Sequence, residues 1–422
     1  MNKNLAAVKR KEKIYIFLIT YLIFMATRMT ASFFDSLALV TVPTAAMLWL
    51  TVIIINLSLA RHKISHSRAV NIFFLVICLW LGWGVFNALA GITSRSIGAI
   101  REFLALVVFT GTISIMKKII TIYDLKVQIL RVTILTVGTM LIVAYIVRFD
   151  GFAFLGSIRN IMGSSGRYRY SYGLGHVNHT GRYCLYFFML KSIYNAVVKE
   201  KKNSLKKYDS YGLYFSIISP VIAIMLLSTA SRTSITGLIG FWIVYYFLTY
   251  WHKARVLEKI LFIISIVPIL AIIIYSVDWA LVYKLSNRGV NYTILPVLDR
   301  EDAWITGLGF LQGTYLFRAV NISVFDSFYL MVLFQSGIVG CIIFFGNLVY
   351  FATVYFSNAK SMTEEQKLVA CLFVVALYYG IFERMFFGHG EFDIINWVLL
   401  LSCLDERTRN VDKQRKNILH NS

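Results

Sequence analysis

The sequence predicts an all-α, polytopic membrane protein with about twelve transmembrane helices. Two compositional features indicate this class: 58% of the 422 residues are apolar, and the mean hydropathy is +0.69. Soluble domains are about 45–50% apolar, and uninterrupted apolar stretches of about twenty residues are typical of membrane spans. The third observation is that apolar runs of this length recur along the whole chain. We therefore expect residues 1–422 to form a single integral membrane domain.

Each apolar run of about 17–25 residues predicts one membrane-spanning segment. The segments are expected to be helices, because lipid offers no hydrogen-bond partner to an exposed backbone group. The tenth run is unusually long and has Gly337 and Gly340 near its middle, and the last run is short. The runs lie at residues 14–29, 37–60, 69–91, 97–116, 128–147, 177–198, 211–229, 234–251, 260–277, 326–357, 368–384 and 392–404.

The basic residues predict how the chain is oriented. Alternate connections carry more than half of the 42 lysines and arginines, at residues 1–13, 61–68, 117–126, 199–209, 252–259, 358–367 and 405–422. Because an excess of Lys and Arg marks the cytoplasmic side, both termini are expected in the cytoplasm, with the protein in the plasma (cell) membrane. Residues 405–422 then form a basic cytoplasmic tail. The net charge of +21 does not indicate nucleic acid, since no basic soluble domain is present to hold it.

The two faces of the predicted bundle differ in the type of basic residue. The cytoplasmic segments use mostly lysine, whereas the outer face carries Lys284 and a set of arginines. A planar guanidinium binds phosphate oxygens through two parallel hydrogen bonds, which an ammonium group cannot do. We therefore expect the outer arginines to serve an anionic ligand. They are Arg28, Arg95, Arg148, Arg159, Arg167, Arg169, Arg232, Arg288, Arg300, Arg318 and Arg384.

Two outer connections are long, at residues 148–176 and 278–325, while the other outer connections are a few residues each. We expect these extracytoplasmic loops to form a lid over an active site that is open to both bilayer and water. The five cysteines lie singly in or beside apolar runs, and none forms a C-x-x-C pair. They are therefore expected to be core residues without a metal or disulfide role.

The first candidate motif is the polar segment at residues 173–182, G-L-G-H-V-N-H-T-G-R, which ends the first long loop and enters the sixth run. Its glycines allow a backbone to approach a ligand closely, and His176 can exchange a proton near neutral pH. His176 and His179 are spaced like metal ligands, but no third ligand lies nearby in the sequence. The alternative is that both histidines simply solvate the start of a helix. Arg182 lies inside the run, where charges are costly and usually face a cavity or a partner.

The second motif is the turn at residues 227–234, L-S-T-A-S-R-T-S, between the seventh and eighth runs. Hydroxyl groups at this position can cap the following helix and also hold an anion at its N-terminus. Capping alone does not explain Arg232, because a cation is disfavoured at that end of a helix dipole.

The third motif is spread along the second long loop. Carboxylates beside arginines there either form weak surface ion pairs or orient a hydroxyl nucleophile and its base. Trp304 suits stacking against a sugar ring, although aromatic residues also gather at every membrane interface. The segments are L-S-N-R at 285–288, D-R-E-D-A-W at 299–304, G-L-G-F at 307–310, F-D-S-F-Y at 325–329 and G-I-V-G at 337–340.

In the order and placement of these motifs, the chain resembles the Wzy-type polysaccharide polymerases, which are relatives of the O-antigen ligases. The resemblance covers most of the chain and implies a GT-C-like architecture. It also implies that a hydroxyl of one undecaprenyl-diphosphate-linked repeat unit attacks the anomeric carbon of a growing chain on a second carrier. The lipid diphosphate leaves and the anomeric configuration inverts, without metal, cofactor or nucleotide sugar. The product would be a capsular or exopolysaccharide chain.

The resemblance and the chemistry together suggest a role for each candidate residue. Departure of a diphosphate needs cations, and attack by a hydroxyl needs a base. The assigned residues are Arg182 and Arg288 for the diphosphate, with Arg167, Arg169 and Arg232 in support; His176 as the base, with Glu301, Asp302 and Asp326 as rivals; and Asn178, His179 and Trp304 for the rest of the substrate. Expected partners are the lipid-linked oligosaccharide, membrane lipid, and a flippase and chain-length regulator of the same pathway.

Two other functions stay open at this stage. A ligase that transfers finished glycan to another acceptor would have similar loops. A flippase for the same lipid-linked unit would also need cations, but lining a central cavity reachable from both sides, and the predicted spans contain few charges.

Overall fold

The computed structural model describes residues 12, 14–23, 25, 67–89, 97–151, 156, 170–174, 177–202, 210–250, 295–300, 302–309, 327–357, 359–383 and 391–421. Within these ranges the chain is helical and contains no strand. Seven of the described helices are long and apolar enough to cross a membrane, which places the protein in the class of polytopic helical membrane proteins. They are α3 (Arg68–Leu89), α4 (Ile97–Tyr123), α5 (Lys126–Arg148), α8 (Ser210–Ser228), α9 (Arg232–Tyr250), α15 (Phe328–Phe356) and α16 (Glu364–Phe382).

Further described helices coincide with predicted spans but are shorter or less apolar. Residues 14–23 form a short apolar helix where the first span is predicted. Helix α7 (Val177–Lys202) occupies the sixth predicted span, and α17 (Glu391–Asn421) begins at the twelfth. The predicted spans at 37–60 and 260–277 lie outside the described residues.

The chain divides into two compact units. Unit 1 comprises residues 1–65, 112–241 and 394–399, and unit 2 comprises residues 66–111, 242–393 and 400–422. Each unit is described by itself below.

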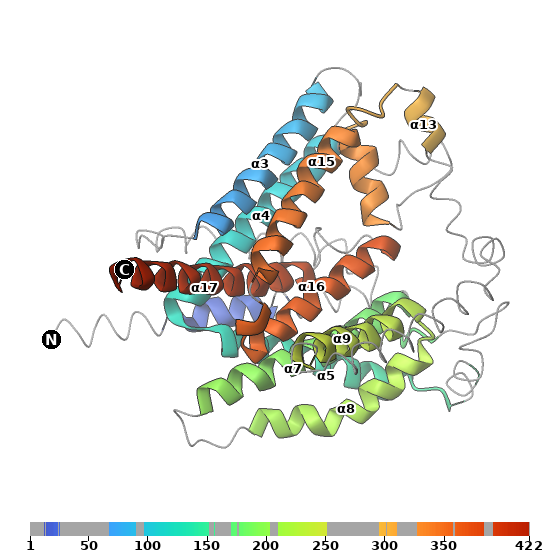
Figure 1. Ribbon diagram of the computed structural model, residues 1–422. Helices are drawn as coiled ribbons and strands as arrows, with labels where there is room; N and C mark the ends of the chain where they lie inside the picture. The colour runs from blue at the N-terminus through green and yellow to red at the C-terminus, as the bar shows by residue number, and fades with distance from the viewer. Residues whose placement is uncertain are drawn as a thin grey trace, which may run out of the picture. The chain divides into compact units, whose positions relative to one another are not determined.

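Unit 1 is built on the mutual packing of α5, α7 and α8 (Figure 1). Gly138 of α5 marks the closest contact: a Cβ at this position would lie 2.8 Å from Ile218 Cδ1 and 3.1 Å from a Phe187 ring carbon. Small residues let membrane helices approach closely and gain dispersion contacts. Glycine at position 138 thus leaves room for the side chains of α7 and α8 against α5.

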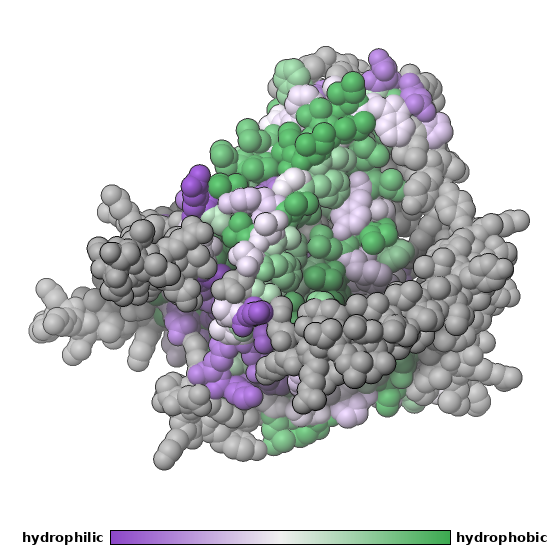
Figure 2. Space-filling view, in the orientation of Figure 1, coloured by the Kyte–Doolittle hydropathy of each residue, from purple (hydrophilic) through white to green (hydrophobic). Residues whose placement is uncertain are grey.

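Unit 2 is built on α3 and α15, which lie side by side (Figure 1). Aromatic pairs join the two helices: Trp80 and Phe344 have ring centroids 5.0 Å apart, and Phe73 and Phe351 have centroids 6.0 Å apart. Apolar side chains cover the visible face of these helices in Figure 2. Such a surface is the one expected to contact lipid, because large exposed apolar patches on soluble proteins are rare.

Helix α15 is not continuous. Gly337 has φ 61° and ψ −167°, which are not helical values, so two helical pieces meet at this residue. The sequence predicts a single long span here and notes Gly337 only as lying near its middle. An apolar run reports hydropathy and length but carries no signal for the direction of the backbone.

The residues predicted as a basic cytoplasmic tail belong to helix α17 as far as Asn421, because Lys, Arg, Glu and Gln are good helix formers. The expectation for the cysteines differs from the structure at Cys78. All five cysteines have free thiols, and Cys184, Cys371 and Cys403 are buried as expected. Cys78 is exposed on α3, so its prediction as a core residue is wrong: an apolar run fixes immersion in lipid but not which side of the helix faces protein.

Candidate functional site

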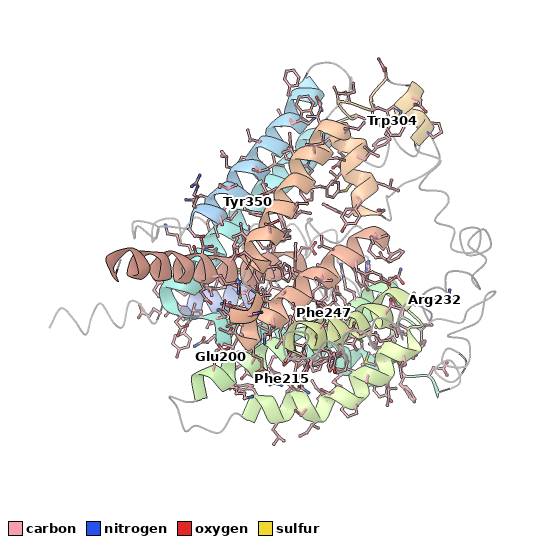
Figure 3. The ribbon with its side chains drawn as sticks, in the orientation of Figure 1. Glu200, Phe215, Arg232, Phe247, Trp304 and Tyr350 are labelled. Atoms are coloured by element: carbon pink, nitrogen blue, oxygen red, sulfur yellow. The ribbon has the colours of Figure 1, made fainter. Side chains whose placement is uncertain are left out.

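Four of the predicted site residues lie in unit 1, where α7 and α9 begin. Asn178, His179 and Arg182 belong to the first turns of α7, and Arg232 is the first residue of α9. We call residues 178–182 together with residues 228–234 the α7–α9 junction. Figure 3 shows Arg232 at the turn between α8 and α9, at the opposite end of the unit from Glu200.

The other predicted residues are not part of this group. Trp304 belongs to unit 2. Asp302, a rival for the base, also belongs to unit 2, where it is exposed and has a φ of 49°. The remaining candidates lie outside the described residues: His176, Arg167, Arg169, Arg288, Glu301 and Asp326.

The junction is closed by a glycine in the first turns of α7. A Cβ at Gly181 would lie 2.7 Å from both Ser231 Cβ and Ser234 Oγ, closer than real Cβ atoms approach other atoms. The glycines of this motif are expected to admit a ligand, but the space beside Gly181 is filled by the two serines. Gly181 therefore serves to bring the start of α7 against the start of α9.

A chain of hydroxyl and amide groups runs through the junction. Ser231 Oγ donates to Asn178 Oδ1 at 3.5 Å and lies 3.0 Å from Ser234 Oγ. The hydroxyl of Thr229 accepts the Ser231 N–H at 3.2 Å. All three hydroxyl residues are fully buried. The serines predicted to cap α9 thus also bind across to α7, which brings two helix N-termini and their positive dipole ends to one place.

The last part of the first long loop packs onto the junction. Tyr172 Oη lies 2.6 Å from Ser228 Oγ, and the Tyr170 N–H donates to Ser228 O at 3.3 Å. On the other side, Thr180 Oγ1 donates to Ser171 O at 2.7 Å. The loop end is therefore fixed to both α7 and the end of α8.

Tyr172 is the anchor of this loop end, and the sequence-based prediction missed it. It is 1% exposed and has a φ of 51°, an uncommon backbone conformation for a bulky residue. Burial raises the pKa of Tyr172 to about 12, so its hydroxyl is protonated at neutral pH. Tyr172 thus holds the loop through a neutral hydrogen bond and cannot act as a general base there.

Arg182 is the buried cation of the junction. It is 7% exposed, and its guanidinium carbon lies 5.6 Å from the centre of the Tyr183 ring. A charged side chain within a membrane helix is costly and is usually retained for a functional reason. It lies one turn beyond Asn178 and directly after Gly181, the residue that contacts Ser231 and Ser234.

Arg232 and Arg148 surround the same region from more exposed positions. Arg232 is exposed at the first position of α9, where the helix dipole disfavours a cation. Arg148, the last residue of α5, is also exposed, and its Nε would lie 3.3 Å from a Cβ at Gly173. Each of these arginines lies at or near a helix end in unit 1, and helix N-termini favour anions.

A second feature missed from the sequence continues the polar face of α7. Asn178, Arg182 and Tyr186 are spaced by four residues and so share one side of the helix. Tyr186 Oη accepts a hydrogen bond of 2.6 Å from Asn396 Nδ2, and both residues are buried. A lone amide inside the apolar run 392–404 is the sequence signal that would have indicated Asn396.

Trp304 is held rigidly within unit 2. Its Nε1 donates to Asp299 Oδ1 at 2.5 Å, and its carbonyl accepts the Ile338 N–H at 2.8 Å. Asp299, one of the carboxylates expected to pair with arginine or to act in catalysis, thus orients an aromatic ring. Among the described residues, no three His, Cys, Asp or Glu side chains gather as a metal site would require.

No family model matches the chain, and no curated protein matches it either. The fold and the junction define a polytopic helical membrane protein with a hydroxyl-rich region where α7 and α9 begin.

Proposed function

We propose that this protein is a glycosyltransferase that polymerises undecaprenyl-diphosphate-linked oligosaccharide repeat units into capsular or exopolysaccharide chains. The proposal includes about twelve transmembrane helices in a GT-C-like arrangement, cytoplasmic termini, and a site on the outer face of the plasma membrane. The observation that carries it is the α7–α9 junction, where the buried Arg182 directly follows Gly181, the residue at which the start of α7 meets the start of α9.

In the proposed reaction, a hydroxyl oxygen of one repeat unit attacks the anomeric carbon of the other glycan. The bond from that carbon to the diphosphate oxygen breaks, the lipid diphosphate leaves, and the hydroxyl proton passes to a base. Arg182 and Arg232 neutralise the charge that develops on the leaving diphosphate, because fixed cations in a dry site stabilise a developing anion strongly. Arg167, Arg169 and Arg288 act with them, and His176 is the proposed base.

The proposal is tested in the native host by replacing Arg182 with alanine and with lysine. Removing one such stabilising group typically slows turnover by about 100-fold or more, so Arg182→Ala cells should accumulate single repeat units on the lipid carrier and lose long chains. Arg182→Lys retains the charge but loses the planar bidentate geometry, so we expect short chains in reduced amount.

Arg131→Ala is the matched control, because Arg131 is a part-buried arginine of the same unit. In the described part of the chain, Arg131 contacts two neutral tyrosines. Its guanidinium carbon lies 4.3 Å from the centre of the Tyr211 ring, and its Nη2 lies 3.3 Å from Tyr194 Oη. We expect normal glycan length in this variant at equal expression.

The glycan profile of Arg182→Ala cells also separates the competing functions. Full-length chains that stay on the lipid carrier would identify a ligase instead. Repeat units trapped on the cytoplasmic side would identify a flippase. An unchanged glycan at normal expression would overturn the proposed role of the junction.

A further inference from the structure

The break in α15 is filled by a segment of the second long loop. Residues 302–309, which we call the docked segment, lie against residues 335–337 of α15, which we call the helix break. Gly337 and Gly307 both have positive φ, of 61° and 76°. A Cβ on Gly337 would collide with the carbonyl oxygen of Ile305, and one on Gly307 with the backbone nitrogen of Gly337. Two backbones therefore touch without intervening side chains.

The backbone groups exposed by the break are paired with the docked segment. Before the break, the carbonyl groups of Phe334 and Gln335 accept the N–H groups of Leu308 and Gly309 at 2.8 and 2.9 Å. After the break, the N–H groups of Ile338 and Val339 donate to the carbonyl groups of residues 304 and 305 at 2.8 and 3.2 Å. Irregular backbone at membrane depth is tolerated when it is satisfied in this way.

Helix α3 supports the break through three side chains. Trp80 Nε1 donates to Ser336 Oγ at 3.1 Å, and Trp83 Nε1 donates to Ser336 O at 3.0 Å. Asn87 Nδ2 donates to the carbonyl oxygen of Thr306 in the docked segment. The break therefore lies at the level of the last three turns of α3.

Two side-chain oxygens at this place have no hydrogen-bond donor. They are Asn87 Oδ1 and Gln335 Oε1, on residues that are 0% and 2% exposed. Asn87 holds the docked segment through its amide nitrogen, and Gln335 holds it through its backbone carbonyl. A buried acceptor without a donor carries the full cost of its lost hydration, so such groups in native proteins call for a missing partner.

The chemistry of the site selects the kind of partner. The N–H groups at positions 338 and 339 are already used, so they are not available to an anion. The carbonyl groups at 334, 335 and 336 are also used, and two amide oxygens are too few for the oxygen shell of a metal cation. What fits is a neutral hydrogen-bond donor, which means a hydroxyl group or a water molecule.

Trp304 favours the hydroxyl group. It lies two residues before Thr306 in the docked segment, is partly exposed, and has its ring fixed by Asp299. An aromatic ring two residues from the carbonyl that Asn87 binds, with hydrogen-bond acceptors on the residues that hold its segment, is a combination that suits a sugar, which has apolar C–H faces and hydroxyl donors.

We propose that the helix break, Asn87, Gln335 and Trp304 form a saccharide-binding subsite in unit 2. Sugar hydroxyls donate to the two amide oxygens, and a sugar ring packs on Trp304. The choice of a saccharide as ligand rests on the proposed function, whereas the need for a neutral donor rests on the geometry alone.

The test is Gln335→Met, which removes the acceptor and nearly preserves the shape of the side chain. Purified protein in lipid nanodiscs is titrated calorimetrically with oligosaccharides that carry no lipid or phosphate: the repeat unit released from the host polysaccharide, and neutral glucose, galactose and N-acetylglucosamine trisaccharides. Loss of one neutral hydrogen bond predicts about 3- to 10-fold weaker binding. Trp304→Ala is expected to weaken binding at least as much.

Asn347→Leu is the matched control. Asn347 also lies in α15, is 3% exposed, donates through Nδ2 to Phe73 O of α3 at 3.3 Å, and has an Oδ1 without a donor. Its hydrogen bond joins α15 to Phe73 of α3, ten residues along α15 from the helix break. We expect unchanged saccharide affinity in this variant.

The outcomes separate the two proposals. Equal saccharide affinity of wild type and Gln335→Met would overturn the subsite, with or without a gain in thermal stability of the variant. It would mean that the Gln335 amide oxygen binds a buried water or no ligand at all. So would a failure of every saccharide to bind. A protein that binds saccharide through Gln335 but never extends a glycan would keep the subsite and overturn the polymerase.

Discussion

Replacing Gly181 by alanine tests whether the α7–α9 junction depends on direct contact between two helices. The added methyl group would lie 2.7 Å from Ser231 Cβ and from Ser234 Oγ. Ser231 lies in the tight turn before α9, so its Cβ moves only with the backbone. The start of α7 therefore has to move away from α9, and the 3.5 Å hydrogen bond from Ser231 to Asn178 is lost with it.

The size of the effect follows from two opposing terms. Overpacking a tight contact costs about 1–3 kcal/mol, and a contact of 2.7 Å against backbone-linked atoms lies at the upper end. Replacing glycine by alanine inside a helix stabilises it by about 0.5–1 kcal/mol. The expected net loss of stability is thus about 1–2 kcal/mol.

Gly240→Ala is the matched control, because Gly240 lies within α9 and a Cβ there would meet nothing within 4 Å. Only the helix-propensity term applies, so this variant should be more stable than wild type by about 0.5–1 kcal/mol. Thermal unfolding of both variants in nanodiscs measures the difference, and glycan length in cells measures the effect on function. Gly181→Ala should lower both, whereas Gly240→Ala should lower neither.

The result that refutes this reasoning is equal stability of Gly181→Ala and Gly240→Ala with long glycan chains in both. It would mean that α7 and α9 do not touch at residue 181. A destabilised Gly181→Ala that still makes full-length chains would retain the contact but remove its importance for the site.

Three further predictions follow from the described contacts. In Gly337→Ala, an alanine has to adopt a positive φ and its Cβ collides with backbone atoms, so the variant should lose more than about 3 kcal/mol of stability. Gly346→Ala has open space around the added methyl group and should not be destabilised. Thermal unfolding of both variants measures the difference. Tyr172→Phe removes a buried hydrogen bond to Ser228 and should cost about 1–3 kcal/mol. The pKa of Tyr172 is raised from 10.0 to about 12 in the folded protein, so between these pH values the unfolded tyrosine ionises before the folded one and folding loses stability. Wild type should therefore lose more stability than Tyr172→Phe between pH 10 and pH 12. Thr363→Ala removes the capping box of α16 and should cost about 1 kcal/mol, measured by chemical denaturation; a loss below 0.3 kcal/mol would contradict the cap.

Hydropathy was sufficient to predict where most helices run. The predicted spans at 128–147 and 211–229 correspond to α5 (Lys126–Arg148) and α8 (Ser210–Ser228) within two residues at each end. These limits are predictable because the bilayer fixes the length of an apolar run and because charged or turn-forming residues follow it directly. The expected count of about twelve includes runs outside the described residues and remains a prediction.

The candidate site was predictable in part. The grouping of polar residues at 173–182 and 227–234 is visible in the sequence, and the two segments meet where Gly181 contacts Ser231 and Ser234. That the two segments meet through Gly181 was not predictable, because helix packing depends on shape and not on residue type. For the same reason Tyr172, whose partner Ser228 is 56 residues away, gave no signal beyond being one of several tyrosines.

The docked segment has a practical consequence for topology mapping. A loop outside the membrane is normally the place to insert an epitope, a protease site or a cysteine reporter, since such segments tolerate change. Residues 302–309 are an exception, because their carbonyl and amide groups complete the backbone of α15. A reporter inserted among them would remove hydrogen bonds from α15. The topology measured with it would then be that of a protein whose α15 is disrupted.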